Sequence, residues 1–137
     1  MKEIFSISFT VFYEDTDSSG FTYHTSYLKF AERARSIMVK ENFKEIFDKM
    51  LKNTFFFVVR KITVKYIKPS FLSDELLVKT YFLKSNKVSL DLKQIILKNG
   101  KPICEMLVKL VWIDGKLKKP CKIPKNLITR FNSHVVV

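Results

Sequence analysis

The sequence contains few of the residues that build disulfide frameworks, metal sites and irregular loops. Its 137 residues include two cysteines, two histidines, three glycines and four prolines. Cys104 and Cys121 form no Cys-x-x-Cys pair and have no histidine at metal-ligand spacing, so we expect ordinary thiols in a reducing compartment and no metal. No stretch approaches the roughly 18 consecutive apolar residues of a membrane-spanning helix. We therefore predict a cytoplasmic protein without a membrane span.

Arginine is also scarce, although the chain is strongly basic. The formal net charge is +12, and 25 residues are lysine or arginine. The arginines are Arg33, Arg35, Arg60 and Arg130. Base recognition and bidentate phosphate contacts favour arginine, so a lysine-rich, well-solvated surface is the better interpretation and we predict no nucleic-acid partner. The alternative is a basic nucleic-acid-binding protein, which a gel shift that survives physiological salt would support.

The apolar content is that of one folded domain. Hydrophobic residues make up 47% of the chain and aromatic residues 14%, far from the composition of disordered segments. A chain of this length buries roughly two thirds of the surface that its unfolded form exposes. We predict a single domain over residues 1–137 with one core, in which residues 116–137 form a basic C-terminal tail.

The hydrophobic pattern predicts a strand followed by one long helix. Residues 4–12 (IFSISFTVF) alternate with the period of a half-buried strand. Over residues 23–41 the apolar side chains recur at intervals of three and four, as in an amphipathic helix. Ala31 and Ala34 lie in its apolar stripe, and small side chains there allow close packing against a sheet. Residues 43–52 are compatible with a second, short helix.

Four further strands follow the helical segments. The apolar runs predict them over residues 55–68, 75–84, 88–98 and 102–113. Asn-Gly and Asp-Gly pairs mark tight turns, which require antiparallel neighbours. Because a single apolar helix must be covered by the face of a sheet, we predict the α+β class and the hotdog fold, a five-stranded antiparallel sheet wrapped around one long helix. Leu127 and Phe131 are compatible with a last helical turn within the tail.

The segment EDTDSSG, residues 14–20, gathers three carboxylates in a basic chain. One interpretation is a calcium loop, because Asp15, Asp17 and Ser19 have the spacing of the first ligands of an EF-hand. This interpretation fails at the end of the loop, where Ser26 lies in place of the bidentate glutamate. A strand, not a helix, is also predicted before the loop.

Two other interpretations of the segment remain open. The first is structural, since aspartate, serine and glycine form turns, Asp15 can hydrogen-bond within the turn, and Thr22 or Thr25 can cap the following helix. The second is catalytic, because the first helical turn has unpaired N–H groups and a partial positive charge that polarise an acyl carbonyl. Asp17 is then placed to act as nucleophile or general base, with Gly20 allowing the chain to fold back.

The residues YEDTDSSGFTYHTSYLKFAERAR, 13–35, resemble the signature of the hydroxybenzoyl-CoA thioesterase-like hotdog proteins. Within that family the resemblance is greatest to the bacterial acyl-CoA thioesterases associated with the Tol-Pal system. It continues in VVRKITVKYIKPSFLSDELLVKT, where the family has a Tyr-x-x-Pro-Ala element, and covers residues 7–127. Two residues depart from the family pattern, since Ser26 replaces an asparagine and Ser70 an alanine. The resemblance implies hydrolysis of the thioester of a fatty or aromatic acyl-CoA.

The resemblance also implies roles for individual residues. The second aspartate of the family motif is catalytic and falls on Asp17, and the backbone N–H that stabilises the oxyanion falls on His24. The residues assigned to substrate binding are Gly20, Tyr23 and Tyr27 in the motif and Lys84, Ser85 and Lys87 in the turn where relatives hold the nucleotide. An ordinary lysine-rich hairpin is the alternative for that turn. No cofactor is implied, because coenzyme A is part of the substrate.

An open sheet edge favours association, since unpaired edges are usually covered or paired. The resemblance implies a homodimer or homotetramer built through edge strands, with active sites at the subunit interface. The basic tail could meet acyl carrier protein or anionic lipid headgroups, although a solvated tail is the simpler interpretation. The alternative function is a non-catalytic module that binds acyl-CoA or acyl carrier protein without releasing thiol. A hotdog dehydratase ranks lower, because its histidine-containing motif is absent.

Overall fold

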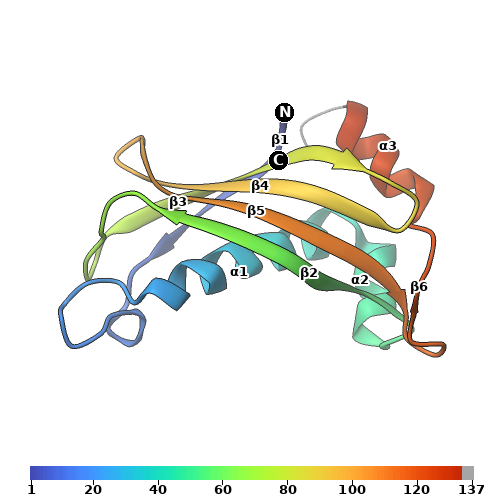
Figure 1. The fold of residues 1–137 in the computed structure, drawn as a ribbon, viewed down its shortest axis with the longest axis horizontal. Helices are drawn as coiled ribbons and strands as arrows, with labels where there is room; N and C mark the ends of the chain where they lie inside the picture. The colour runs from blue at the N-terminus through green and yellow to red at the C-terminus, as the bar shows by residue number, and fades with distance from the viewer. Residues whose placement is uncertain (134–137) are drawn as a thin grey trace.

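The computed structural model describes residues 1–133, which form a curved antiparallel sheet with one long helix along its inner face (Figure 1). The elements in chain order are β1 (Lys2–Thr10), the 3-10 turn η1 (Tyr13–Asp15), α1 (His24–Asn42), α2 (Lys44–Leu51), β2 (Phe55–Tyr66), β3 (Glu75–Ser85), β4 (Ser89–Lys98), β5 (Lys101–Asp114), β6 (Lys119–Pro120) and α3 (Lys125–Ser133). The predicted α+β class and hotdog arrangement are confirmed. The long helix differs from its prediction by one residue at each end.

The strands of the sheet lie in the order β1-β3-β4-β5-β2, and every neighbouring pair is antiparallel. The successive strands β3, β4 and β5 are neighbours, as their short connections predict. β2 pairs with β5 and not with β3, although β3 follows β2 in sequence. The two-residue strand β6 pairs with the end of β5. Along the part of the chain that the structure describes, β2 thus has one strand partner and one unpaired edge.

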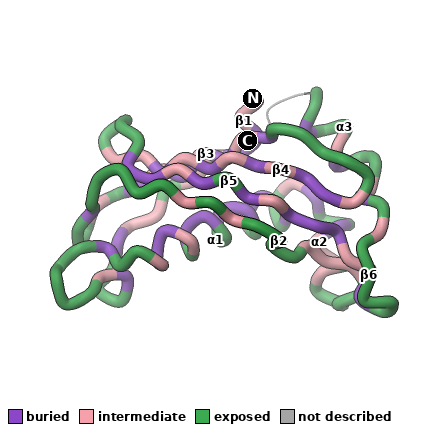
Figure 2. The backbone as a smooth tube through the Cα atoms, in the orientation of Figure 1, coloured by how far each residue is buried: buried purple, intermediate pink, exposed green. Residues whose placement is uncertain are grey.

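The inward face of α1 packs closely on the sheet because its stripe contains small side chains. Ala31 and Ala34 are fully buried, as is the ring of Phe30 beside them. The strands contribute alternate residues to the same core, such as Leu76 and Val78 of β3. Figure 2 shows the buried part of α1 beneath the sheet and the largely exposed loop at its amino-terminal end. The fold therefore holds the helix start at the edge of the core, next to solvent.

The first strand differs from its predicted course. It covers Lys2–Thr10 instead of residues 4–12, and a register shift between Glu3 and Phe5 breaks the alternation. Ile4 and Phe5 are consequently both buried, although strict alternation predicts opposite faces for them.

The predicted basic tail is solvated only in part. Residues 116–120 are exposed, whereas Ile123 is buried. The last helical turn predicted at Leu127 and Phe131 belongs to α3. β6 and α3 occupy this segment, and Leu127 and Phe131 of α3 are buried. The Phe131 ring packs against Phe43 and Phe82, with ring centroids 5.4 and 5.3 Å apart. The apolar side of α3 thus outweighs the lysine-rich composition of the segment. Residues 134–137 of the predicted tail lie outside the described residues. Within residues 1–133, no helix is long and apolar enough to cross a membrane.

Candidate active site

The acidic segment before α1 folds into a tight turn held by backbone hydrogen bonds. The Asp17 N–H donates to the Phe21 carbonyl at 3.0 Å, and the Gly20 N–H donates to the Asp17 carbonyl at 3.0 Å. Gly20 has a φ of 86°, a left-handed conformation that glycine adopts without a steric penalty. Gly20 therefore lets the chain fold back, as predicted. The turn leaves the Asp17 side chain exposed.

The first aspartate of the motif anchors the loop. Asp15 is buried, and its carboxylate accepts a hydrogen bond from the Phe12 N–H at 2.9 Å. The Asp15 carbonyl accepts from the Tyr23 N–H at 2.8 Å and from the Ser26 hydroxyl at 3.0 Å. The prediction that Asp15 forms turn hydrogen bonds is confirmed. Ser26, which replaces the asparagine of the family pattern, supports the same loop.

The second aspartate is the charged group of the loop. The Asp17 carboxylate accepts hydrogen bonds from the hydroxyl and from the backbone N–H of Ser19, the latter at 2.9 Å. The Ser19 hydroxyl, then the Ser19 N–H and, more weakly, the charge of His24 lower the pKa of the Asp17 carboxyl below its ordinary value. The carboxylate therefore stays ionised at neutral pH, which a nucleophile or a general base requires.

The first turn of α1 has no side-chain cap. Tyr23 occupies the N-cap position, and no side-chain hydrogen bond caps the helix there. The predicted Thr22 or Thr25 cap is wrong, because the Thr22 hydroxyl is hydrogen-bonded to the Ser70 hydroxyl at 2.6 Å. Within residues 1–133, the backbone N–H groups of His24 and Thr25 donate to no acceptor. Both donors can therefore bind an anionic oxygen.

A hollow of about 320 Å³ opens beside the helix start. Its walls include His24 and Tyr27 of α1 and Tyr66 at the end of β2. The Tyr66 hydroxyl donates to the His24 carbonyl at 2.9 Å, which holds the ring next to the first helical turn. Tyr66 was not among the predicted site residues. Val64 and Tyr66 are two positions apart on β2, so their side chains lie on the same, helix-facing side of the strand. This alternation could have indicated Tyr66 from the sequence.

The predicted site residues of the motif gather at the amino-terminal end of α1. His24 and Tyr27 line the hollow, whereas Asp17, Gly20 and Tyr23 lie in the adjoining loop and do not line it. The Tyr23 ring packs on the His24 ring, with centroids 4.5 Å apart. The effect of the His24 charge on Asp17 indicates that the loop and the helix start share one electrostatic environment. The structure thus brings Tyr23, His24 and Tyr27 together at the hollow, with Asp17 and Gly20 in the loop that leads to it.

The predicted nucleotide-binding turn, residues 84–87, lies at the other end of the sheet. β3 begins at Glu75, opposite Thr10 and therefore close to the acidic loop, and ends at Ser85. The strand between these points is roughly 33 Å long. Within one chain the turn does not approach the hollow, so its part in substrate binding stays a prediction.

A buried polar cluster lies beneath the helix start and was not predicted. Ser70 is fully buried, and its hydroxyl is hydrogen-bonded to the hydroxyls of Thr22 at 2.6 Å and Tyr27 at 2.8 Å. The Ser70 carbonyl also accepts the Thr22 N–H at 2.8 Å. The serine that replaces the alanine of the family pattern thus connects the segment after β2 to the start of α1. The replacement of the family's alanine by Ser70 was the feature of the sequence that could have indicated this cluster.

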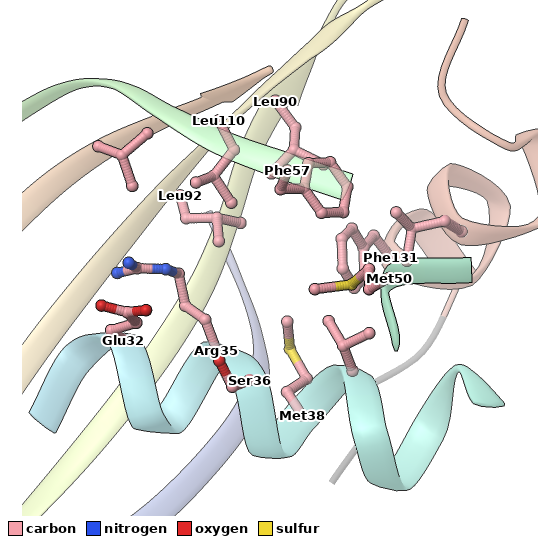
Figure 3. A pocket seen from close by; sticks show the side chains of 13 residues that line it. Glu32, Arg35, Ser36, Met38, Met50, Phe57, Leu90, Leu92, Leu110 and Phe131 are labelled. Atoms are coloured by element: carbon pink, nitrogen blue, oxygen red, sulfur yellow. The ribbon is translucent and has the colours of Figure 1, made fainter. Parts of the chain in front are cut away.

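A second cavity, of about 120 Å³, lies between the other half of α1 and the sheet (Figure 3). Figure 3 shows Glu32 and Arg35 side by side at one end of it. Arg35 is only 9% exposed, and its guanidinium donates to the Gln94 side-chain carbonyl at 2.8 Å. Gln94 in turn donates to the Ala31 carbonyl at 2.9 Å and to the Thr80 hydroxyl at 3.0 Å. Burial lowers the pKa of Arg35, and the carboxylate of Glu32 opposes this shift.

The thiols are poorly suited to nucleophilic chemistry. Cys104 and Cys121 are free, and burial raises the pKa of Cys104 to about 12 and also raises the pKa of Cys121. Both thiols are therefore protonated at neutral pH. Over residues 1–133, no group of three or more His, Cys, Asp or Glu residues is arranged to hold a metal ion.

Comparison with protein families matches residues 11–131 of the chain to the thioesterase-like superfamily. The chain belongs to this superfamily. The match includes the acidic loop, α1, all of the sheet except β1, and most of α3. It confirms the predicted resemblance to hotdog thioesterases and the predicted enzyme class, a thioester hydrolase.

Curated relatives and solved structures agree with this assignment. The acyl-CoA thioester hydrolase YbgC of Escherichia coli O6:H1 is 36% identical over 123 residues, which cover 88% of this chain and 90% of that protein. The acyl-CoA thioesterase YbgC of Haemophilus influenzae is 30% identical over 129 residues, 93% of this chain and 94% of the relative. A probable thioesterase from Bartonella henselae has a TM-score of 0.77 at 27% identity, covering 87% of this chain and 98% of its own. The 1,4-dihydroxy-2-naphthoyl-CoA thioesterase from Synechocystis shares the fold, with a TM-score of 0.85 at 16% identity and coverage of 94% and 96%.

Proposed function

We propose that this thioesterase hydrolyses acyl-CoA thioesters to a free acid and coenzyme A. The observation that carries the proposal is an ionised Asp17 in the loop that leads into a helix start with unpaired backbone donors. The names of the curated relatives, which are acyl-CoA thioester hydrolases, support this substrate class. The acyl group is fatty or aromatic.

The donors of the first helical turn stabilise the oxyanion. The N–H groups of His24 and Thr25 lie at the amino-terminal end of α1, where the helix dipole is positive. A thioester carbonyl oxygen bound there accepts hydrogen bonds that strengthen as negative charge develops on it. Loss of one such donor typically costs about 3 to 4 kcal/mol of activation free energy.

Asp17 acts on the carbonyl carbon of the same thioester, through water or directly. In the water route the carboxylate takes a proton from water, the water oxygen bonds to the carbonyl carbon, and the carbon–sulfur bond breaks. The proton then passes to the leaving thiolate, so the products are a carboxylic acid and a thiol. In the direct route an Asp17 carboxylate oxygen bonds to the carbonyl carbon and the carbon–sulfur bond breaks, which gives a mixed anhydride and the thiolate. Water then hydrolyses the anhydride to the free acid and the Asp17 carboxyl group, whose proton passes to the thiolate. A positioned base contributes roughly 10² to 10⁴ in rate.

Among residues 1–133 the outer edge of β2 pairs with no strand, and this edge supports a dimer as the active species. Val59 and Tyr66 on this strand are each 48% exposed, and the edge has backbone groups free to pair. Such an edge favours antiparallel pairing with a second copy through a two-fold axis. The hollow at the Tyr66 end of the strand then lies at the subunit interface.

Positive charge near the hollow attracts the phosphates of coenzyme A. Lys68 lines the hollow of its own chain and provides such a charge. Lys84, Ser85 and Lys87 contribute only if the corresponding turn of another subunit reaches the hollow, because in one chain they lie at the far end of the sheet.

The substitution Asp17→Asn tests this function, with thiol release from a panel of acyl-CoA substrates as the measurement. We expect kcat/KM to fall by roughly 10² to 10⁴. Thermal unfolding should change little, because the Asp17 side chain is exposed. Glu14→Gln is the matched control, since Glu14 is an exposed carboxylate of the same loop, and it should keep its activity. Wild-type rates in the Asp17 variant would refute the assignment, and tight binding of acyl-CoA by the wild type without thiol release would support the non-catalytic module instead.

A further inference from the structure

Two connecting segments meet at the end of the sheet that lies opposite the helix start. They are residues 49–54, which join α2 to β2, and residues 114–119, which join β5 to β6. The Gly115 N–H donates to the Thr54 carbonyl at 2.8 Å, and a Cβ added at Gly115 would lie 2.1 Å from the Asn53 carbonyl oxygen. Figure 1 shows α2 and β6 together at this end, away from the start of α1. We call the surface of these two segments the basic end.

The basic end has a high density of positive charge. It contains five lysines and one aspartate, and the lysines are all exposed: Lys49, Lys52, Lys116, Lys118 and Lys119. The aspartate, Asp114, is half-buried, and its carboxylate accepts the N–H groups of Lys116 and Leu117 at 2.9 and 3.0 Å. Among residues 1–133, none of these lysines takes part in a salt bridge. The lysine charges therefore face solvent, where they attract a partner of negative charge.

Two leucines project from the same surface. Leu51, the last residue of α2, is 67% exposed, and Leu117, in the turn between β5 and β6, is 64% exposed. These are the two most exposed leucines of the described residues. The turn that holds Leu117 is fixed by the Asp114 carboxylate and by the Lys118 N–H, which donates to the Asp114 carbonyl at 2.8 Å. Only an apolar medium outside this chain can remove these two side chains from water.

A bilayer with anionic phospholipids matches both features. Lysines near such a surface are attracted to its headgroups, and apolar side chains beside them enter the boundary between headgroups and acyl chains. A nucleic acid would bind the lysines but leave the leucines in water. A protein partner would need a continuous apolar patch at the centre of its contact, whereas Leu117 lies between Lys116 and Lys118 and Leu51 directly precedes Lys52.

We propose that the basic end binds the surface of an anionic phospholipid membrane, with its lysines at the headgroups and Leu51 and Leu117 inserted below them. The inference goes beyond the proposed function and does not depend on it. α2 follows directly on α1, whose 19 residues are roughly 28 Å long. The hollow at the start of α1 therefore lies away from the membrane and stays accessible to a substrate from solution.

Sedimentation of the full chain with phospholipid vesicles tests the charge contribution. We expect binding to equal parts of phosphatidylcholine and phosphatidylglycerol to be at least about tenfold tighter than to phosphatidylcholine alone, and to fall steeply at about 1 M salt. Lys116→Gln and Lys118→Gln should each weaken it by about fivefold. Lys101→Gln is the matched control, because Lys101 is exposed at the opposite end of β5, and it should bind as the wild type does. Equal binding to both kinds of vesicle would overturn the proposal.

Leu51→Ser and Leu117→Ser test the insertion of the leucines. Each variant should bind the mixed vesicles about tenfold more weakly, because the apolar side chain that leaves water is lost. Leu72→Ser is the matched control, since Leu72 is 50% exposed and lies between β2 and β3 at the opposite end of the sheet. It should bind as the wild type does.

Two results of these variants would contradict the proposal. If the lysine variants bind more weakly and the leucine variants do not, the basic end is a general polyanion surface and the membrane assignment is wrong. A changed native mass of Leu51→Ser or Leu117→Ser in size-exclusion chromatography would identify the leucines as a contact between copies of this chain, which would also overturn it.

Tryptophan fluorescence locates the turn relative to the bilayer. Trp112 is the only tryptophan of the chain and is 2% exposed, so its emission responds little to a surface contact. In a Leu117→Trp variant, the mixed vesicles should shift the emission to shorter wavelength, and lipids brominated on their acyl chains should quench it, because indole rings settle at the membrane interface. Unshifted and unquenched emission from vesicle-bound protein would place the turn outside the bilayer and overturn the proposal.

Discussion

The two ends of α1 have different surroundings, and the difference separates chemistry from packing. At the amino-terminal end the N-cap has no side-chain hydrogen bond, and the charged Asp17 of the preceding loop is exposed. At the carboxyl-terminal end α2 and α3 cover the helix, where the Phe43 ring packs edge-to-face on Phe131. A cap at the first end would stabilise the helix by about 1 kcal/mol, but it would occupy a donor of the proposed oxyanion site.

The amino-terminal end of α1 is held in place by hydrogen bonds from Ser70 and Tyr66 and not by a helix cap. The hydroxyl of Ser70 binds those of Thr22 and Tyr27, and the Tyr66 hydroxyl donates to the His24 carbonyl. These contacts position the first turn through side chains and one carbonyl oxygen. In the described part of the chain they leave the His24 and Thr25 N–H groups without an acceptor, so the helix start is ordered and still able to bind an anion.

The packed part of the helix should be the most sensitive in stability. Gln94→Leu leaves the buried Arg35 guanidinium without its hydrogen-bond acceptor, and we expect a loss of about 2 to 4 kcal/mol in the free energy of unfolding. Urea unfolding measures it. The double variant with Arg35→Met should recover part of the loss, because no unpaired charge remains. A loss under about 0.5 kcal/mol in the single variant would show that the pair contributes little.

At the other end, Ser70→Ala should reduce both stability and activity. The variant leaves the hydroxyls of Thr22 and Tyr27 without their buried partner, at a cost of about 1 to 3 kcal/mol. Because these hydroxyls position the helix start, kcat/KM should also fall when measured well below the melting temperature. Ser89→Ala, at a buried serine near the far end of the sheet, serves as the control and should keep its activity. Full activity in Ser70→Ala would show that this cluster of hydroxyls does not position the helix start.

A pair of glycines separates the effect of backbone strain from the effect on the site. Gly20 and Gly100 have φ values of 86° and 77°, and an added Cβ meets no atom within 4 Å at either position. Substitution of each by alanine should therefore cost a similar free energy of unfolding, about 1 to 2 kcal/mol. Gly20→Ala should also lower kcat/KM, because it alters the turn that positions Asp17, whereas Gly100→Ala should leave kcat/KM unchanged. Equal activity in the two variants would argue against that turn as part of the site.

The smallest expected effect is a shift in the pH profile. Ser19 stabilises the charged form of Asp17, so its hydrogen bonds lower the pKa of the carboxyl, and activity that needs the carboxylate is lost only as pH falls through this lowered pKa. Ser19→Ala removes the hydroxyl donor and raises this pKa. The acid limb of the kcat/KM profile should then move to higher pH, with the plateau unchanged. Ser18→Ala, at an exposed residue of the same turn, should leave the limb in place.

Local sequence patterns were sufficient for the helix and for the position of the loop. The three-and-four spacing around Ala31 and Ala34 depends only on neighbouring residues, and it predicted α1 to within one residue at each end. The motif around Asp17 likewise placed the acidic turn directly before the helix. The cap was predicted wrongly because the Thr22 hydroxyl has a partner 48 positions away in sequence.

By itself the sequence determined the succession of strands and helices along the chain, the turn-forming residues of the acidic loop and the resemblance to a thioesterase family. Each of these depends on residues close together along the chain. Tertiary structure alone decided that Tyr66 and Ser70 reach the helix start, that Arg35 is buried beside Gln94, and that α3 is part of the core. Those outcomes depend on contacts between residues far apart in sequence, such as Arg35 and Gln94, which are separated by 59 positions. The spacing of Leu127 and Phe131 indicated a helical turn. It did not indicate the partners of that turn, because the rings of Phe43 and Phe82 that pack against Phe131 come from distant parts of the chain.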